Sequence, residues 1–212
     1  MAAWPGRGVA EVLVGKTVLV GVTGGVAAHY VPGLIGQLRW RHMVAVWVVM
    51  TEAATHFITP LMLETASGNP VAVDMFERDR RWPVAHVNLA RLADIVLVAP
   101  ATANTIGKVA CGLADNLLTA IIMATRAPVV FAPAMNPQMW TNPIVQGNIG
   151  RLRELGYHFV EPRVGVLATG EQGMGCMAEV NVIVARLIEV AGELSAEVEN
   201  HQQKGGRRNA NV

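Results

Sequence analysis

A short stretch in the second half of the chain carries side chains that suit the recognition of a small polar ligand. Residues 133–140 read Pro-Ala-Met-Asn-Pro-Gln-Met-Trp and directly follow the apolar run of residues 128–132. Open α/β sheets bind their ligands at the carboxyl ends of the strands. The uncharged amide of Asn136 could hold a carboxylate or an amide in an apolar pocket. The alternative is a strand-to-helix turn in which Asn136 caps the next helix and the methionines and tryptophan belong to the core.

A glycine loop earlier in the chain suits an anion. Residues 21–28 read Gly-Val-Thr-Gly-Gly-Val-Ala-Ala and lie between an expected strand and an expected helix. Glycines let backbone amides turn inward, and a helix N-terminus adds partial positive charge. The loop is neither a P-loop nor a clean GxGxxG fingerprint, so a simple tight turn is the alternative. Thr51, at the end of the next strand, could cap a helix, face the same phosphate, or do both.

Small and short polar residues follow the third expected strand. Residues 99–108 read Ala-Pro-Ala-Thr-Ala-Asn-Thr-Ile-Gly-Lys, and residues 113–118 read Leu-Ala-Asp-Asn-Leu-Leu. Together they predict a shallow shelf with a polar edge, on which a flat ring with imide edges, such as a flavin, could lie. Helix capping by Thr102 and Asn104 is the alternative.

His86 is the one histidine of six that we single out, in the stretch Trp-Pro-Val-Ala-His-Val-Asn-Leu-Ala at residues 82–90. Histidine titrates near neutral pH and can therefore act as a catalytic base. The alternative is a surface or structural histidine. The other five lie in expected helices or strands or in the C-terminal tail, and we assign them no role.

Composition excludes several classes of protein. The chain has 212 residues, of which 52% are apolar and 16% charged, and its net charge is +1. This charge gives no field that would attract nucleic acid or an anionic membrane. We find no apolar run long enough to span a membrane and no signal peptide. Cys111 and Cys176 are too few for a disulfide framework and badly spaced for a metal site. We expect a cytoplasmic protein without a metal, and the low charge content suggests buried contacts in a homo-oligomer.

The alternation of strands and helices predicts an α/β fold with a Rossmann-like, doubly wound parallel sheet. We expect a flexible N-terminus over residues 1–15, one domain over 16–194, and a disordered polar tail over 195–212. The expected strands are residues 16–22, 44–50, 93–99, 128–132 and 158–160. The expected helices are residues 27–42, 52–58, 60–67, 103–111, 115–125, 142–155 and 179–193.

These motifs, in this order, resemble the homo-oligomeric flavin-containing cysteine decarboxylases. That family includes phosphopantothenoylcysteine decarboxylase and the peptidyl-cysteine decarboxylases of lantibiotic-type peptide biosynthesis. The resemblance runs from about residue 16 to residue 190 and includes Gly-Glu-Gln-Gly-Met-Gly at residues 170–175.

The resemblance implies FMN as the cofactor and an active site shared between the subunits of a trimer or a multiple of trimers, such as a dodecamer. It also implies that His86 is the catalytic base and that Asn136 holds the substrate carboxylate. The residues expected at FMN are Thr23, Gly24, Gly25, Val26, Thr51, Ala101, Thr102, Asn104, Thr105, Asp115 and Asn116. Those expected at the substrate are Met135, Asn136, Met139, Trp140 and Thr169, beneath a lid formed by residues 162–178.

One departure from the family pattern bears on the reaction. Thr169 stands where the phosphopantothenoylcysteine enzymes have the cysteine that returns a proton, and Cys176 stands where the family more often has arginine. A threonine hydroxyl cannot replace a thiol as an acid at neutral pH. We therefore expect FMN-dependent oxidative decarboxylation of the C-terminal cysteine of a precursor peptide to an aminoenethiol, in ribosomal peptide natural-product biosynthesis. The alternatives are phosphopantothenoylcysteine decarboxylase of coenzyme A biosynthesis, a flavin-binding regulatory subunit and, less favoured, a flavin prenyltransferase.

Overall fold

A six-stranded parallel sheet forms the centre of the molecule in the computed structural model, which describes residues 11–76 and 84–209. The strand order is β3-β2-β1-β4-β5-β6, so the direction of winding reverses between β1 and β4 and creates the crevice in which doubly wound proteins bind ligands. The predicted α/β doubly wound fold is confirmed. The strands are β1 Thr17–Val22, β2 Ala45–Met50, β3 Val71–Ala72, β4 Ile95–Ala101, β5 Val129–Pro133 and β6 His158–Phe159.

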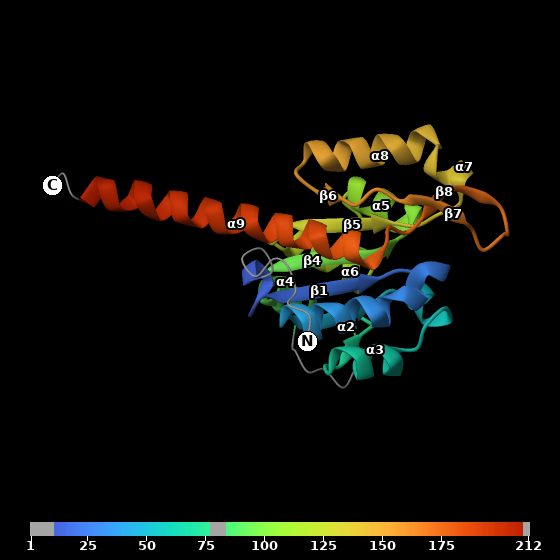
Figure 1. The fold of residues 1–212 in the computed structure, drawn as a ribbon, viewed down its shortest axis with the longest axis horizontal. Coiled ribbons are helices and arrows are strands. Elements are labelled where there is room, and N and C mark those ends of the chain that lie inside the picture. The colour runs from blue at the N-terminus through green and yellow to red at the C-terminus, as the bar shows by residue number, and fades with distance from the viewer. Residues whose placement is uncertain (1–10, 77–83, 210–212) are drawn as a thin grey trace, which may run out of the picture.

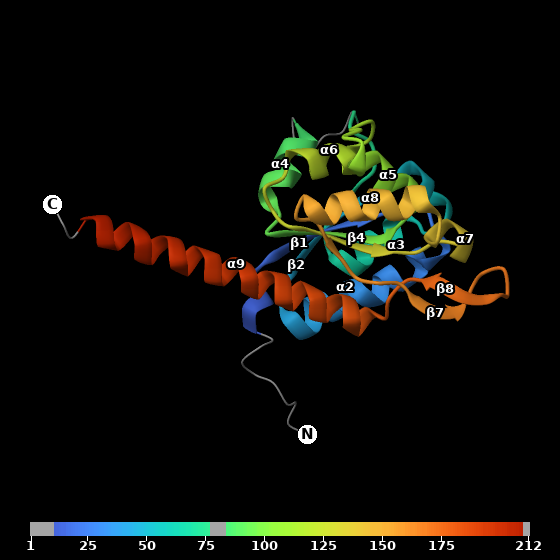
Figure 2. The ribbon, with the colours of Figure 1, turned by 90° about the horizontal axis from the view of Figure 1, so that it is seen from above.

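Helices cover both faces of this sheet (Figures 1 and 2). Along β1, Val18 and Val20 pack into one core and Leu19 packs into the other, because successive side chains of a strand point to opposite faces. The first core is completed by α2 Val31–His42, α3 Pro60–Ser67 and α9 Val180–Asn209. The second is completed by α4 Ala85–Leu92, α5 Ala103–Ala110, α6 Leu117–Ala124 and α8 Pro143–Glu154.

The remaining elements are short. An antiparallel hairpin of β7 Arg163–Val166 and β8 Gln172–Cys176 lies at the edge of the molecule beside α7 Pro137–Trp140 (Figure 2). Three 3₁₀ helices occur in the described chain: η1 Glu11–Leu13, η2 Val26–Tyr30 and η3 Glu52–His56. The helix expected over residues 27–42 is divided into η2 and α2, and Pro32 stands in the first turn of α2, where its missing N–H costs no helical hydrogen bond. We did not predict β3, α4 or the strands of the hairpin.

The two ends of the domain differ from our expectation. Within the segment expected to be flexible, Leu13 is fully buried against the first core. The three apolar residues in a row at positions 12–14 are too few for a periodic pattern. At the other end, α9 continues to Asn209 and projects from the body (Figure 1), where we expected a disordered tail from residue 195. Residues 195–204 contain no proline or glycine and several good helix formers, so a solvated helix can form there without an apolar stripe. Residues 1–10 and 210–212 of the expected flexible ends lie outside the described residues.

In the described part of the chain, no helix is long and apolar enough to cross a membrane.

Candidate active site

A cavity of about 780 Å³ lies at the carboxyl ends of the central strands, within the range of small-molecule sites. Three groups of residues predicted separately from the sequence line it: the glycine loop, the polar shelf and the Asn136 segment. The hairpin β7–β8 forms a fourth wall. The predicted site residues on this cavity are Gly24, Gly25, Val26, Thr51, Thr102, Asn104, Thr105, Asp115, Asn116, Met135, Asn136, Met139 and Thr169.

The glycine loop forms one end of the cavity. An ideal Cβ at Gly24 would lie 2.6 Å from the Cβ of Ala53, so a side chain at position 24 would force the loop away from η3. The hydroxyl of Thr51 accepts a hydrogen bond from the N–H of Ala54 at 3.3 Å and caps η3. Thr51 also lines the cavity, so capping and ligand contact are compatible at this position.

Two residues predicted to contact FMN lie beneath the cavity rather than on it. Thr23 is 1% exposed; its hydroxyl donates to the carbonyl oxygen of Pro100 at 2.5 Å and accepts from the N–H of Thr102 at 3.1 Å. Ala101 is fully buried. Thr23 thus joins the loop after β1 to the end of β4, and the carbonyl oxygen of Ala101 accepts from the N–H of Ala134 at 3.1 Å. The neighbouring residues Gly24 and Thr102 line the cavity instead.

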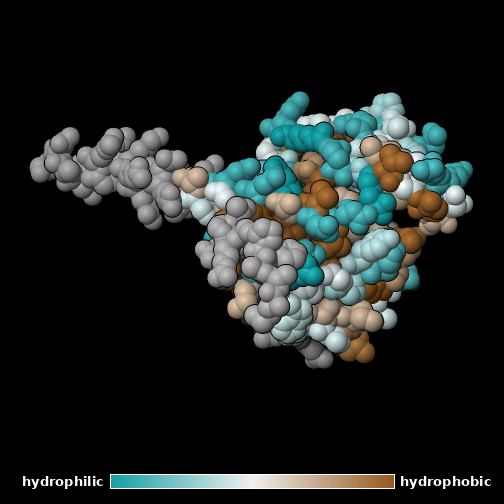
Figure 3. All heavy atoms as spheres, in the orientation of Figure 1, coloured by the Kyte–Doolittle hydropathy of each residue, from teal (hydrophilic) through white to brown (hydrophobic). Residues whose placement is uncertain are grey.

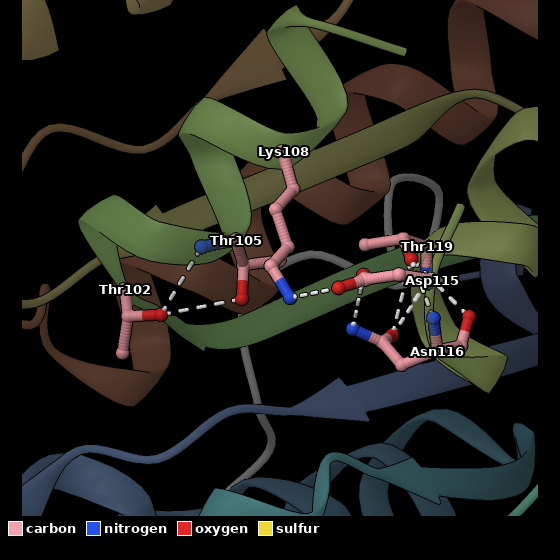
Figure 4. Close-up of polar contacts among 6 residues, drawn as sticks. All are labelled: Thr102, Thr105, Lys108, Asp115, Asn116 and Thr119. Atoms are coloured by element: carbon pink, nitrogen blue, oxygen red, sulfur yellow. Dashed lines mark hydrogen bonds and ion pairs between the residues drawn. The ribbon is translucent and has the colours of Figure 1, made fainter. Parts of the chain in front are cut away.

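The polar shelf is a network of helix caps and one ion pair (Figure 4). The hydroxyl of Thr102 accepts from the N–H of Thr105 at 3.4 Å and caps α5, and Asn116 forms a capping box with Thr119 at the start of α6. Between the two helices, Lys108 Nζ donates to Asp115 Oδ2 at 2.6 Å. This bond holds the pKa of Asp115 below its ordinary value. The capping alternative is therefore correct for Thr102 but not for Asn104, which lies within α5, and the capped edge still faces the cavity.

Asn136 is both a helix cap and a wall of the cavity. Its Oδ1 accepts from the N–H of Gln138 at 2.8 Å at the start of α7. This contact fixes which end of the amide is oxygen, and Nδ2 makes no hydrogen bond to a described residue. An unused N–H donor without charge suits a carboxylate. Met135 and Met139 line the cavity beside it, whereas Trp140 does not and packs against the second core.

The hairpin closes the cavity through two close approaches of backbone. The N–H of Met135 donates to the carbonyl oxygen of Gly175 at 3.0 Å, and an ideal Cβ at Gly173 would lie 2.7 Å from Cγ of Pro137. Thr169, at the tip, and Cys176, on β8, both line the cavity, and Cys176 Sγ lies 3.6 Å from the carbonyl oxygen of Val166. Apolar side chains are exposed at this end of the molecule, among them Val166 (Figure 3).

His86 does not join the other predicted residues. It is half-buried on α4 and does not line the cavity of its own chain. Trp82, quoted with it in the sequence motif, lies outside the described residues.

Several lining residues were not among those we predicted. They are His29, Tyr30, Glu52, Phe57, Lys108, Arg163, Leu167 and Cys176. Lys108 stands in a motif that we quoted and Cys176 was considered only as a substitute acid. Arg163 had no signal in the sequence because its strand was not predicted.

Comparison with known proteins places the chain in a family. The sequence profile of the Flavoprotein family matches residues 9–192, and the chain belongs to that family. Phosphopantothenoylcysteine decarboxylase of Mus musculus is 43% identical over 179 residues, covering 83% of this chain and 87% of the relative. A probable phosphopantothenoylcysteine decarboxylase of Streptococcus mutans is 40% identical over 176 residues, covering 82% of this chain and 98% of the relative. The bifunctional coenzyme A biosynthesis protein CoaBC of Vibrio vulnificus is 41% identical, and this chain spans 43% of its length.

Solved structures show the same relationship. The FMN-dependent cysteine decarboxylase SpaF matches with a TM-score of 0.74 and 35% identity, covering 85% of this chain and 99% of SpaF. A PPC decarboxylase mutant complexed with pantothenoylaminoethenethiol matches with a TM-score of 0.72 and 34% identity, covering 84% of this chain and 98% of the mutant. The predicted family and the predicted cofactor are thereby confirmed: the protein is a flavoprotein of the cysteine decarboxylase type, and its cofactor is FMN.

The residues on the cavity fit this cofactor. The Gly24–Gly25 loop lines the cavity just before η2. The N–H of Gly25 donates to the carbonyl oxygen of Thr23 at 2.9 Å, so the phosphate of FMN would be held by the other N–H groups of this loop. The small Ala103 together with Asn104, Thr105 and Asn116 presents a low, polar-edged surface to a flat ring. In the described chain, no three His, Cys, Asp or Glu side chains gather in a way that could hold a metal ion.

Proposed function

We propose that the protein is an FMN-dependent decarboxylase of a substrate that ends in a cysteine, and that its first candidate substrate is 4′-phosphopantothenoylcysteine. The observation that carries the reaction is the convergence, in one cavity, of an anion loop, a ring-sized polar shelf and the free amide N–H of Asn136. The curated relatives favour this substrate, the first of the alternatives named above, over the precursor peptide that the sequence motifs favoured.

Bound FMN would supply an acceptor for the hydride of the cysteine β-carbon, which makes loss of CO₂ possible. The protein has to orient the substrate and control its protons. Asn136 would hold the carboxylate through its Nδ2, and the absence of charge on the amide lets the carboxylate depart as CO₂. Met135 and Met139 would keep water away from the reacting carbon.

The base is expected to come from a neighbouring subunit. His86 is separated from the cavity of its own chain, and the surface around it is rich in exposed apolar side chains. Val84 is 47% exposed, Leu92 39% and Met123 39%, on or beside the packed helices α4 and α6. Exposed apolar surface of this kind marks a subunit contact. A trimer or a multiple of trimers, such as a dodecamer, would bring His86 of one chain to the cavity of the next. There it would accept the proton of the substrate thiol.

A peptide ending in cysteine is the second candidate substrate, and Thr169 favours it. Its hydroxyl lines the cavity where a returning acid would be needed, and without that acid the product stays an aminoenethiol. A purely regulatory flavin-binding subunit would need neither a free Asn136 amide nor His86.

Mass spectrometry of two incubations tests the proposal. FMN-loaded protein is given 4′-phosphopantothenoylcysteine in one and a peptide ending in cysteine in the other. Loss of CO₂ from the small substrate, alone or with two hydrogens, supports the first candidate, and loss of CO₂ with two hydrogens from the peptide supports the second. No change in either substrate contradicts the proposed reaction.

A further inference from the structure

Arg163 is a cation on the hairpin wall of the cavity, and it has no role in the reaction proposed above. It stands at the start of β7, is half-buried, and lines the cavity. The other basic side chains on this cavity in the described chain are His29, whose ring Nδ1 lies 2.7 Å from the carbonyl oxygen of Val26, and Lys108, which is paired with Asp115 as Arg163 is paired with Glu179. Both belong to the side expected to hold FMN, so Arg163 is the cation on the substrate side.

One nitrogen of the guanidinium contacts a carboxylate, and the other two are available to a ligand. Its Nε lies 2.8 Å from Glu179 Oε1, while Nη1 and Nη2 have no hydrogen bond to a described residue. An ideal Cβ at Gly165 would lie only 2.7 Å from Nη1 and 3.0 Å from Cys176 Sγ. The absence of a side chain at Gly165 is therefore what lets the guanidinium lie across the hairpin. A guanidinium tethered at Nε keeps two N–H-bearing nitrogens for a phosphate.

Arg163 and Asn136 stand on the same side of the cavity. Position 163 pairs with Cys176 across the hairpin, and the adjacent Gly175 is bonded to Met135, next to Asn136. Nη1 of Arg163 lies beside Gly165, which pairs with Gly173, and Gly173 lies against Pro137. Both Arg163 and Asn136 line the cavity. A substrate that uses both needs a carboxylate and a second anion.

We propose that Arg163 binds the phosphate of a substrate whose cysteine carboxylate is held by Asn136; this assignment rests on the decarboxylation proposed above. The neutral backbone of a peptide would leave Nη1 and Nη2 without an anion. The acidic Glu171 at the tip is exposed and does not line the cavity, so it does not oppose a phosphate inside.

Calorimetric binding to the FMN-loaded protein isolates this contact. The probes are 4′-phosphopantothenate and pantothenate, which differ only in the phosphate and lack the cysteine needed for turnover. We expect the wild-type protein to bind the phosphorylated probe more tightly by roughly tenfold or more, the value of a charge-assisted hydrogen bond. Arg163→Gln should remove this preference and Arg163→Lys should keep part of it. Arg153→Gln is the control: it removes the same charge from an exposed pair with Glu161 outside the cavity. This variant should keep the preference for the phosphorylated probe unchanged.

The outcomes separate the two proposals. Flavin absorbance and the melting temperature of each variant show that it is folded and loaded. CO₂ release from 4′-phosphopantothenoylcysteine is measured in parallel. If the wild-type protein shows no phosphate preference, or Arg163→Gln retains it, the role of Arg163 is overturned even if CO₂ is released. If the preference is present and depends on Arg163 but no CO₂ appears, the anion site is supported and the decarboxylase is overturned.

Discussion

The backbone N–H of Met135 donates to the carbonyl oxygen of Gly175 at 3.0 Å and ties the hairpin β7–β8 to the segment that carries Asn136. Gly175 has a φ of +141°, and an ideal Cβ there would lie 2.1 Å from the carbonyl oxygen of Met135. A side chain at position 175 would have to push the two segments apart. The hairpin wall of the cavity, with Arg163, Thr169 and Cys176, is therefore positioned by one glycine.

Gly175→Ala should destabilise the protein by about 1–3 kcal/mol, the cost of forcing a residue with a side chain into a rare backbone conformation. It should also weaken substrate binding, because the hairpin would detach from Met135. Gly147→Ala is the matched control: an ideal Cβ at this helical position meets no atom within 4 Å. Thermal unfolding and substrate titration check both variants. A Gly175→Ala protein with unchanged melting temperature and affinity would show that the contact is not needed.

His86→Asn should lower turnover by about 10²–10⁴-fold, the usual contribution of a general base, while flavin absorbance stays unchanged. The structure adds a sharper expectation, since His86 does not line its own cavity. When His86→Asn is mixed with inactive Asn136→Asp under conditions that exchange subunits, some sites receive both intact residues and activity should return. If the mixture stays inactive although mixed oligomers form, the site is not shared in this way.

Asn136→Asp should raise the KM for the cysteine substrate and lower turnover by about a hundredfold or more, because it places a like charge against the substrate carboxylate. Asn142→Asp is the control. Asn142 caps α8 through the N–H of Ile144, as Asn136 caps α7, but does not line the cavity. Steady-state kinetics compare the two. Aspartate caps a helix as well as asparagine does, so equal effects at both positions would indicate a general effect of the added charge rather than lost substrate binding.

The second candidate substrate makes a prediction about Thr169. If this residue leaves the reaction oxidative, an anaerobic incubation with a peptide ending in cysteine should stop after about one equivalent of product per FMN, because the cofactor has no other route to reoxidation. Thr169→Cys should then shift part of the product from loss of CO₂ with two hydrogens to loss of CO₂ alone. Many anaerobic turnovers of the wild-type protein with loss of CO₂ alone would contradict the oxidative outcome, and Cys176→Ser would be the next variant to test.

The lowered pKa values of two histidines predict how the stability of the protein depends on pH. Burial lowers the pKa of His158, with a further contribution from Arg186, and burial followed by Arg41 lowers the pKa of His42. The unfolded chain therefore takes up these protons at a higher pH than the folded chain. Stability should be full above about pH 6.5 and fall as the pH decreases from there toward the lowered pKa values. Melting temperatures between neutral and acidic pH should fall less in His158→Gln than in the wild type, and an identical fall would exclude His158 as a cause.

The central sheet could be predicted because its strands are buried on both faces. β1, β2, β4 and β5 are continuous apolar runs that few other structures accommodate. The hairpin lacks such a run: β8 reads Gln-Gly-Met-Gly-Cys, and its glycines are explained only by the close approach to Met135 and Pro137. That approach is a tertiary contact, which a local pattern cannot show.

Some site residues could also be predicted from a local pattern, whereas others depend on tertiary structure. Gly24 and Asn136 were recognisable because a loop or a cap at a strand end reaches the ligand crevice whatever the details of packing. Thr23 and Ala101 were misplaced because neighbouring side chains at a strand end point in opposite directions. His86 could be singled out by type and motif, but it does not line the cavity of its own chain.

Release of labelled CO₂ tests the central claim most directly. Carboxyl-labelled 4′-phosphopantothenoylcysteine and a carboxyl-labelled peptide ending in cysteine are each incubated in air with FMN-loaded wild-type protein and with Asn136→Asp. We predict that the wild-type protein releases labelled CO₂ over many turnovers from the phosphorylated substrate and that Asn136→Asp releases almost none. Wild-type protein with bound FMN that releases no label from either substrate would contradict the account.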